Sequence, residues 1–335
     1  MSPDLSFCDL RQVAEPLPVA RLVSPVWRRF VAYEIDKLIL FIFGAATGKV
    51  FFDRLAQLGL WGQLAGFCVA VIYFASFDSK IGNGQTFGKR WLKVRVVDAK
   101  GDTISFAKSL LRSVIFLAPV FLFGLNLPET QTSWIVYVYV FVIILGVSCS
   151  TLFFIAFNRQ ARQGLHDLAA GSYVGNADDV GFVEGSPISK AQWVTIGSLL
   201  FIALVVAGIG CSKLEMMPPL PQMRNDAILI EQMGGIQRAQ LSDRLLHDAI
   251  GGGAKKNLNV SITLRSKSVN QEAFADEVAR VILQNDQHAQ NYDQLSIRLN
   301  DGYDIGIAAH WNHQEFTRAP ADWSQRVFAV SQEQR

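Results

Sequence analysis

A few charged side chains lie in or next to apolar stretches of this chain, where an uncompensated charge is expensive. Asp36 lies about seven residues inside an apolar segment that starts near Arg29, and Arg112 lies at the start of another. Arg29, Ala32 and Asp36 have the spacing of one helix face, and the small Ala32 leaves room for a neighbouring helix. The sequence therefore predicts that Asp36 faces the interior of a helix bundle, with Arg29 and Arg112 as its natural partners.

His166 and Asp167 form a second group of titratable side chains, in a polar stretch expected at the membrane surface. A histidine beside a carboxylate could relay protons near neutral pH. The alternative is structural, because Asp167 could cap a short helix over residues 168–171 or pair with Arg29 or Arg112.

Two interpretations of these charges are open. In the structural one, Arg29, Asp36, Arg112 and Asp167 form an ion-pair network that holds three membrane helices together. In the functional one, Asp36 is a titratable site on a path for ions or protons. Transporters usually carry broken helices and an internal repeat. Pro119 could break one predicted helix, but the sequence contains no visible repeat.

Residues 78–109 form a basic loop that contains the sequence Gly84-Gln-Thr86-Phe-Gly88-Lys89. A phosphate-binding loop needs four residues between its first glycine and the Gly-Lys pair, followed by Ser or Thr. Here three residues separate the glycines and an arginine follows the lysine, so we do not expect nucleotide binding. The glycines instead permit a tight turn at the membrane surface. The basic side chains expected against anionic headgroups are Lys89, Arg90, Lys93 and Arg95.

Five apolar segments are long enough to place these residues on membrane-spanning helices, which need about 20 apolar residues each. The first is the weakest, because Glu34, Asp36 and Lys37 interrupt it. After about residue 214 the charges are mixed, as in a soluble domain. The predicted fold class is therefore a membrane α-helical bundle of about five transmembrane helices plus a small soluble α+β domain. The segments are 30–50, 58–77, 110–127, 134–157 and 193–211.

Lys and Arg concentrate in alternate connections, which indicates the direction of the spans. Basic residues precede the first segment and fill the 78–109 loop and the connection after the fourth segment, whereas residues 126–133 contain none. This pattern predicts an inner-membrane protein with a cytoplasmic N-terminus. With five spans, the C-terminal domain is periplasmic or otherwise extracytoplasmic, and a miscounted span would move it to the other side.

The C-terminal domain has the alternating patterns of an α+β fold. The predicted arrangement is a small β-α-β-β unit with helix packed on sheet. His310 and His313 are expected in an exposed loop rather than in a metal site. Helices are predicted over 224–233, 239–250 and 271–284, strands over 258–264, 295–299 and 303–307, and a hairpin turn over 300–302.

Composition argues against several classes of function. The formal net charge is +2, and the C-terminal domain is nearly neutral, so we expect no nucleic-acid partner. The four cysteines are scattered through apolar segments and the N-terminal tail, which argues against a disulfide scaffold or a cysteine-based metal site. No Ser-His-Asp or paired-carboxylate pattern stands out. We therefore expect no enzyme activity, no cofactor and no metal.

The order of these motifs resembles the RDD family of membrane proteins over about residues 26–174. The family is named for an arginine and two aspartates, which map onto Arg29, Asp36 and Asp167. Ser172 stands where the family usually has threonine. The resemblance implies a transmembrane bundle but no single activity, although cation/proton antiport has been suggested for some members. The matching motifs are 28–36, 84–90 followed by 94–98 and Gly101, 109–112, and 163–172.

The sequence thus predicts a multi-pass RDD-type protein that acts as a membrane-anchored interaction or assembly component. Its expected partners are the lipid bilayer, a protein at the C-terminal domain, and further copies of the chain. The alternative is an ion- or proton-coupled secondary transporter of the cation/proton antiport type that uses Asp36. The predicted regions are a cytoplasmic tail (1–27), a four-helix RDD-like domain (28–175), a cytoplasmic linker (176–192), a fifth transmembrane helix (193–212) and an extracytoplasmic domain (213–335).

Overall fold

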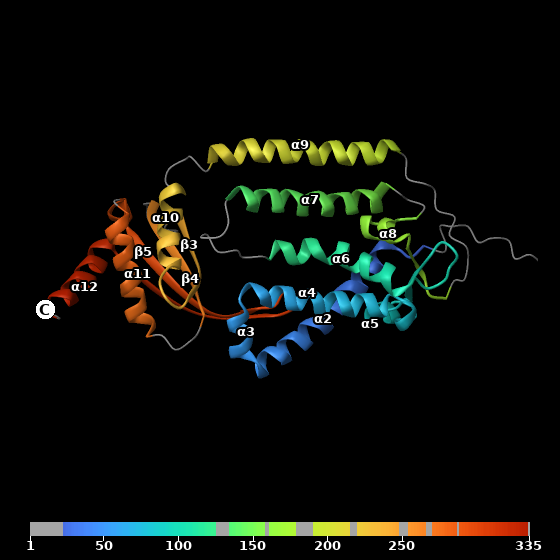
Figure 1. Ribbon diagram of the computed structural model, residues 1–335, viewed down its shortest axis with the longest axis horizontal. Helices are drawn as coiled ribbons and strands as arrows, with labels where there is room; N and C mark the ends of the chain where they lie inside the picture. The colour runs from blue at the N-terminus through green and yellow to red at the C-terminus, as the bar shows by residue number, and fades with distance from the viewer. Residues whose placement is uncertain are drawn as a thin grey trace, which may run out of the picture. The chain divides into compact units, whose positions relative to one another are not determined.

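The computed structural model forms two compact units, each assembled from stretches that are distant in the sequence (Figure 1). Most of the predicted tail, most of the linker and the connection over residues 126–133 lie outside the described residues. The described residues are 23–124, 134–157, 161–178, 190–214, 220–247, 254–265, 270–286 and 288–333. The first unit takes its described residues from Met1–Asp36, Tyr73–Ser113 and Ser150–Ser189, and the second from Lys37–Ile72, Val114–Cys149 and Lys190–Arg335.

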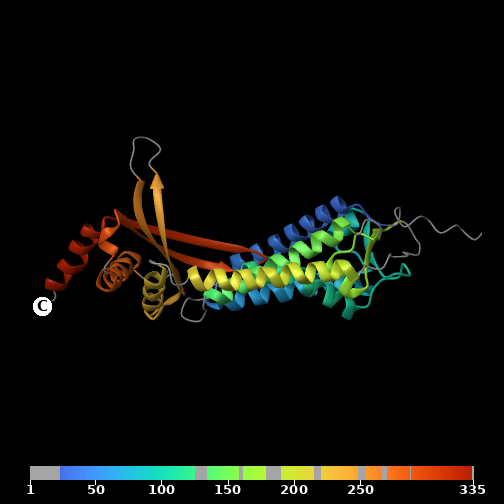
Figure 2. The same cartoon turned by 90° about the horizontal axis from the view of Figure 1, so that it is seen from above.

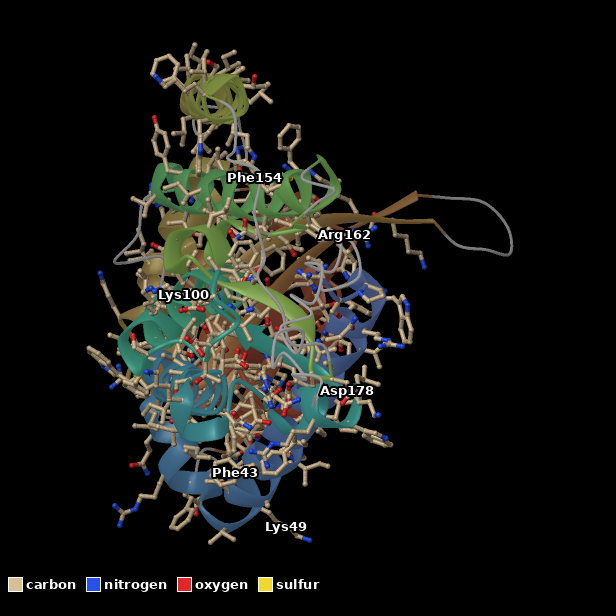
Figure 3. All side chains as sticks on the ribbon, turned by 90° about the vertical axis from the view of Figure 1, so that its right-hand side faces the viewer. Phe43, Lys49, Lys100, Phe154, Arg162 and Asp178 are labelled. Atoms are coloured by element: carbon tan, nitrogen blue, oxygen red, sulfur yellow. The ribbon has the colours of Figure 1, made fainter. Side chains whose placement is uncertain are left out.

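Apolar helices dominate the chain up to residue 214. Among the described residues, three helices are long and apolar enough to cross a membrane. The structure thus confirms a helical membrane bundle plus a soluble α+β domain. On α2, Phe43 and Lys49 point outward from the ribbon (Figure 3). The three helices are α4 (Leu60–Phe77), α6 (Phe106–Phe123) and the Val138–Ala156 part of α7 (Trp134–Phe157).

Two further helices coincide with predicted spans, but whether they cross a membrane stays a prediction. Helix α2 (Val26–Val50) is long enough, although its charged residues lower its hydropathy. Helix α9 (Lys190–Leu214) has a shorter apolar core, Trp193–Ile209, among the described residues. A short helix, α3 (Phe52–Leu58), lies between α2 and α4.

In the first unit, a small antiparallel sheet brings two of the sequence motifs together. Strand β1 (Val94–Val97) pairs with β2 (Tyr173–Asn176), and Val94 and Val96 are fully buried. This pairing places the glycine-rich loop beside the motif that contains Asp167. The short helices of the unit are η1 (Lys80–Gly82), α5 (Phe87–Trp91) and α8 (Leu165–Ala170).

The C-terminal domain packs helices on a four-stranded sheet with the order β3-β4-β5-β6. Strand β4 pairs antiparallel with β3 and parallel with β5, and β6 closes the sheet antiparallel to β5. The inward side chains of β4 and β5 are almost fully buried, and the Trp323 indole donates to the Leu295 carbonyl at 3.0 Å. The elements are α10 (Leu220–Glu231), β3 (Ile236–His247), β4 (Ala254–Leu264), α11 (Gln271–Asn285), η2 (Ala289–Asn291), β5 (Gln294–Asp304), β6 (Ala309–Arg318) and α12 (Pro320–Glu333).

The predicted helix over residues 239–250 is wrong, because this segment forms most of β3. Ala239 is fully buried and pairs with Ile262 of β4. The pairing of a long antiparallel strand overrides the local preference of the leucine-rich segment, since strand formation depends on its neighbours more than helix formation does.

The hairpin turn is also later than predicted. Residues 300–302 continue β5, and Gly302 allows the backbone of Trp311 to approach closely. The turn lies at residues 305–308, where Gly306 has a φ of +72°. His310 and His313, expected in an exposed loop, are exposed residues of strand β6.

The tip of the β5–β6 hairpin packs against helices of the same unit (Figure 2). Tyr303, Ile305 and Ala308 are each at most 6% exposed and form a cluster with Phe52 and Leu55. The Tyr303 and Phe52 rings meet edge to face at 5.8 Å. The hairpin therefore extends beyond the soluble domain into contact with the helical part of its unit.

Glycines on two helices make room for this hairpin. In α4, a methyl group on Gly62 or Gly66 would collide with the backbone carbonyl of Asp304 or Ile305. In α2, Gly44 lies equally close to Ala308. Small residues four positions apart usually allow two membrane helices to approach each other. Here the same spacing admits a β-hairpin.

Candidate functional site: a buried charge network

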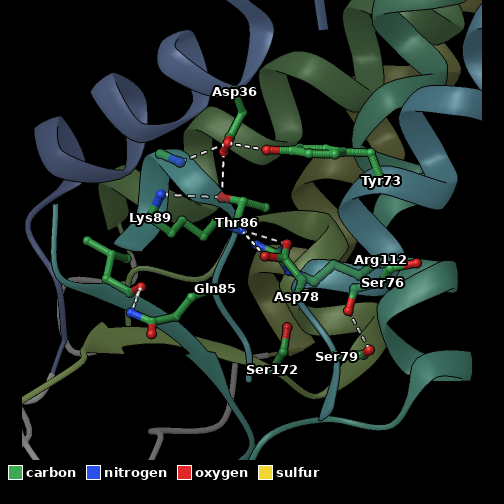
Figure 4. Close-up of polar contacts among 12 residues, drawn as sticks. Asp36, Tyr73, Ser76, Asp78, Ser79, Gln85, Thr86, Lys89, Arg112 and Ser172 are labelled. Carbon is green, nitrogen blue, oxygen red and sulfur yellow. Dashed lines mark hydrogen bonds and ion pairs between the residues drawn. The ribbon is translucent and has the colours of Figure 1, made fainter. Parts of the chain in front are cut away.

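Asp36 is fully buried and accepts three hydrogen bonds (Figure 4). The donors are the Tyr73 hydroxyl at 2.7 Å, the Thr86 hydroxyl at 2.5 Å and the Gly88 amide at 2.9 Å. Both carboxylate oxygens are engaged. A buried carboxylate needs such donors, because losing them would leave its charge without solvation.

The glycine-rich motif folds so that α5 begins directly beside Asp36. Thr86 caps α5 and accepts a hydrogen bond from the Lys89 amide at 3.3 Å. A methyl group on Gly88 would collide with the Ala32 carbonyl, so only glycine permits this approach to α2. The predicted face of Arg29, Ala32 and Asp36 is therefore the face that packs on the motif.

A chain of alternating charges lies next to Asp36 in the first unit. Lys89 donates to both carboxylate oxygens of Asp78 at 2.5 Å. Arg112 donates to Asp78 at 2.6 Å and to Asp167 at 2.8 Å. All four side chains are at most 9% exposed. Each buried charge thus has an opposite charge in contact, which is the condition under which such groups are tolerated.

Asp167 also fixes the local fold of α8. Its carboxylate accepts from the Gly164 amide at 3.3 Å and lies 3.1 Å from the Ser172 hydroxyl, which donates to it. Burial opposes its ionisation, but the interactions with Arg112, Arg29 and, in acid, the protonated His166 hold the pKa of Asp167 below its ordinary value. The predicted pairing with Arg112 occurs. The predicted cap of a helix over residues 168–171 does not, because α8 begins at Leu165 and Asp167 lies inside it, where it accepts from the amide of the N-cap residue, Gly164.

His166 is buried beside Asp167, with Nε2 3.4 Å from the carboxylate. Burial lowers the pKa of His166 to about 4, although Asp167 works in the opposite direction. The imidazole is therefore neutral at pH 7 and does not change charge in the range that a proton relay near neutral pH would need.

Arg29 contacts backbone carbonyls instead of a carboxylate. It donates to the carbonyls of Arg162 at 2.6 Å and Val174 at 2.8 Å. The expectation that Arg29 or Arg112 pairs with Asp36 is therefore wrong. Arg29 and Asp36 are about 10 Å apart along the helix axis, so each finds partners at its own level.

The structure brings together most of the predicted site residues, but in a different network from the one expected. Arg29 and Gly84 lie outside it, because each contacts only backbone groups. Its predicted members are Asp36, Thr86, Gly88, Lys89, Arg112, His166 and Asp167. Asp78 and Tyr73 were not predicted as site residues, and Asp78 holds two cations at once. A signal was present, since Asp78 directly follows an apolar segment and Tyr73 lies in it. Among the described residues, no group of three or more His, Cys, Asp or Glu could hold a metal ion.

The basic loop also differs from its predicted role. Lys89, expected against lipid headgroups, is only 7% exposed and is paired with Asp78. Burial lowers the pKa of Lys89, and Asp78 opposes this effect. Gly84 has a φ of +70° and pairs with Ser79 and Val96 through its backbone, which ties the loop to β1. The motif is thus a structural element of the network.

Comparison with known proteins identifies this part of the chain. No curated protein and no solved structure gives a significant match. The model of the RDD family matches residues 23–171, which contain every member of the charge network. Residues 23–171 therefore form an RDD family region, and the apolar helices of the chain are those of a membrane protein.

Proposed function

We propose that the chain is a multi-pass membrane protein whose RDD bundle anchors the C-terminal domain for interaction with a protein partner. The observation that carries this proposal is the environment of Asp36, whose carboxylate has three donors and no exposed surface. A proton or cation could bind there only if these donors were rearranged. The proposed role of Asp36 is therefore to hold the bundle together.

The remaining charges support the same role. Asp78, Lys89, Arg112 and Asp167 connect the end of α4 with α5, α6 and α8 in one chain of ion pairs. Breaking such a chain leaves a buried charge without its partner, so the network favours one arrangement of the segments. The proposed role is binding and anchoring rather than catalysis.

The C-terminal domain is suited to be the part that binds a protein partner. It has its own core, and its β5–β6 hairpin packs against α2, α3 and α4 within the second unit. A partner bound to this domain would be connected to the helices through the hairpin.

We further propose that the first unit lies on the cytoplasmic side and that the C-terminal domain is extracytoplasmic. The first unit contains the basic segments around Arg28, residues 80–108 and Arg162. Lys and Arg near span ends favour the cytoplasmic side. The orientation is tested with a variant whose four native cysteines are replaced and into which one cysteine is introduced, as Lys100→Cys or as Glu277→Cys. A membrane-impermeant maleimide added to intact cells should label only position 277, and labelling of position 100 alone would reverse the orientation.

Flux measurements distinguish the anchor from the carrier. Wild type and Asp36→Asn are reconstituted in liposomes, and proton and cation fluxes are followed under several gradients. The proposal predicts no protein-dependent flux and a lower melting temperature for the variant. Flux through the wild type that Asp36→Asn abolishes, while the variant remains folded, would instead establish a transporter that uses Asp36.

A further inference from the structure

Helix α5 has a second face that the charge network does not use. Gly88 and Lys89 are buried, whereas Phe87 and Trp91 are 49% and 75% exposed. Ile81, in the turn before α5, is 74% exposed. Large apolar side chains gathered on the surface of a folded unit mark a contact with a partner or a membrane.

A fixed positive charge lies beside these apolar side chains. The Arg90 guanidinium is 6.0 Å from the ring centre of Phe77 and 5.9 Å from that of Phe87, and it donates to the Gly82 carbonyl at 3.3 Å. These contacts hold the guanidinium in place but leave other N–H groups unused. Among the described residues, no carboxylate is within ion-pair distance of Arg90 or of the exposed Lys80.

The position of this charge along the chain indicates its ligand. Phe77 is the last residue of α4, which is long and apolar enough to cross a membrane. A cation at the end of such a helix lies at the depth of the lipid phosphates, and tryptophan is common at the same level. Arginine binds phosphate with two parallel hydrogen bonds.

We propose that Arg90 binds the phosphate of an anionic phospholipid, while Ile81, Phe87 and Trp91 lie at the boundary of the acyl chains. The site uses the exposed half of the glycine-rich motif, and the buried half holds Asp36 and Asp78. This lipid site does not depend on whether the bundle is an anchor or a carrier, so the proposal goes beyond the proposed function.

The lipid site is connected to Asp36 through a short aromatic stack. The Tyr73 ring lies 5.1 Å from Phe77 and 6.4 Å from Phe87, and its hydroxyl donates to Asp36. A lipid that fixes Arg90 also fixes the rings below it. The bound phospholipid therefore stabilises one of the three donors of Asp36.

Native mass spectrometry of the full chain tests the site. Detergent-purified protein is mixed with equal amounts of phosphatidylglycerol and phosphatidylcholine, and the first bound lipid is counted. We expect phosphatidylglycerol to be retained about fivefold over phosphatidylcholine, the preference expected for one basic residue near a charged surface. Arg90→Gln should remove this preference. Lys100→Gln, which removes an exposed lysine in the turn after β1, should keep it.

Trp91→Ala keeps the proposal testable if Arg90→Gln does not fold, because Trp91 is exposed. This variant should lose affinity for both lipids. The proposal would be overturned if wild type and Arg90→Gln had the same preference for phosphatidylglycerol, or if Arg90→Gln and Lys100→Gln lost that preference equally.

Two other results would assign the surface to a different ligand. If lipid-free protein bound inorganic phosphate in a way that requires Arg90, and showed no lipid preference, the site would bind a free anion. A dimer that Trp91→Ala dissociates, with lipid retention unchanged, would assign the patch to a second copy of the chain.

Discussion

Helix α2 contributes to both compact units, and its two parts are held by different kinds of contact. In the first unit, Asp36 is held by hydrogen bonds beside a chain of buried ion pairs. In the second unit, Gly44 and Gly48 are held by close packing against the β5–β6 hairpin. The first contact requires particular donors and charges, whereas the second requires only the absence of a side chain.

This difference matters in a membrane. An ion-pair network tolerates no loss of a single partner, because the remaining charge is buried without compensation. Packing around glycine tolerates small changes better, because a neighbour can shift before the contact is lost. The first unit should therefore be more sensitive to conservative substitutions than the second.

The largest effect is expected for Arg112→Ala. This substitution removes the cation that joins Asp78 and Asp167, and Lys89 remains to compensate only one of the two carboxylates. We expect a loss of about 3–5 kcal/mol in the free energy of unfolding, measured by denaturant titration in detergent micelles. Lys108→Ala, an exposed change on the same helix, is the matched control and should unfold like wild type. Similar stability of both variants would show that the network does not hold the unit together.

Thr86→Val tests whether Asp36 depends on its individual donors. Valine keeps the shape of threonine but removes the hydroxyl that donates to Asp36 and caps α5. We expect a loss of about 1.5–3 kcal/mol, because a buried charged acceptor loses a partner. Thr86→Ser keeps the hydroxyl and should recover most of the stability in the same titration. If serine were no better than valine, the methyl group of Thr86 and not its hydroxyl would be the important part.

Gly66→Leu examines the other contact. The new side chain would collide with the Ile305 carbonyl and push the hairpin away from α4. We expect a loss of about 1–3 kcal/mol. Amide hydrogen exchange should become faster over residues 302–308 and stay unchanged in the first unit. Gly197→Leu on α9, where nothing lies within 4 Å, is the control for an added leucine in a helix. Unchanged exchange in the hairpin would rule out a tight contact at Gly66.

The sequence predicted elements well where one local pattern decided the structure. The apolar segment over residues 134–157 coincides with α7, and the alternation over residues 258–264 lies within β4. The inward face of Arg29, Ala32 and Asp36 was predicted from helix spacing alone. These features depend on periodicity, which is visible within a single segment.

Features that depend on distant partners were not predictable in this way. Asp78 pairs with Lys89 and Arg112, and the second of these is 34 residues further along the chain. Two glycines, Gly302 and Gly306, could each form the hairpin turn, and local sequence favoured the first. Packing of the tip against the helices favours the second, because Gly302 is needed where the strand backbones approach.

A pH titration sharpens the comparison further, because two buried groups in different units have pKa shifts of opposite sign. Burial lowers the pKa of His166 from 6.5 to about 4, so the unfolded chain binds the proton more strongly. The neutral His166 therefore lowers the free energy of unfolding only in acid: there is no penalty above about pH 6.5, and stability is lost as the pH falls toward 4. His166→Gln should therefore gain in melting temperature relative to wild type between pH 6.5 and 4.5.

Asp226 on α10 should have the opposite dependence. Burial, helped by the charge of Asp286, raises the pKa of Asp226 from 3.8 to about 6, so the folded chain binds the proton more strongly. Its contribution is present below about pH 4 and is lost as the pH rises through 6. Asp226→Asn should match wild type near pH 4 and melt a few degrees higher at pH 7. Subtracting the melting temperature of wild type from that of each variant at the same pH removes the pH effects of all other groups. If both differences changed in the same direction with pH, the two units would not respond through these groups.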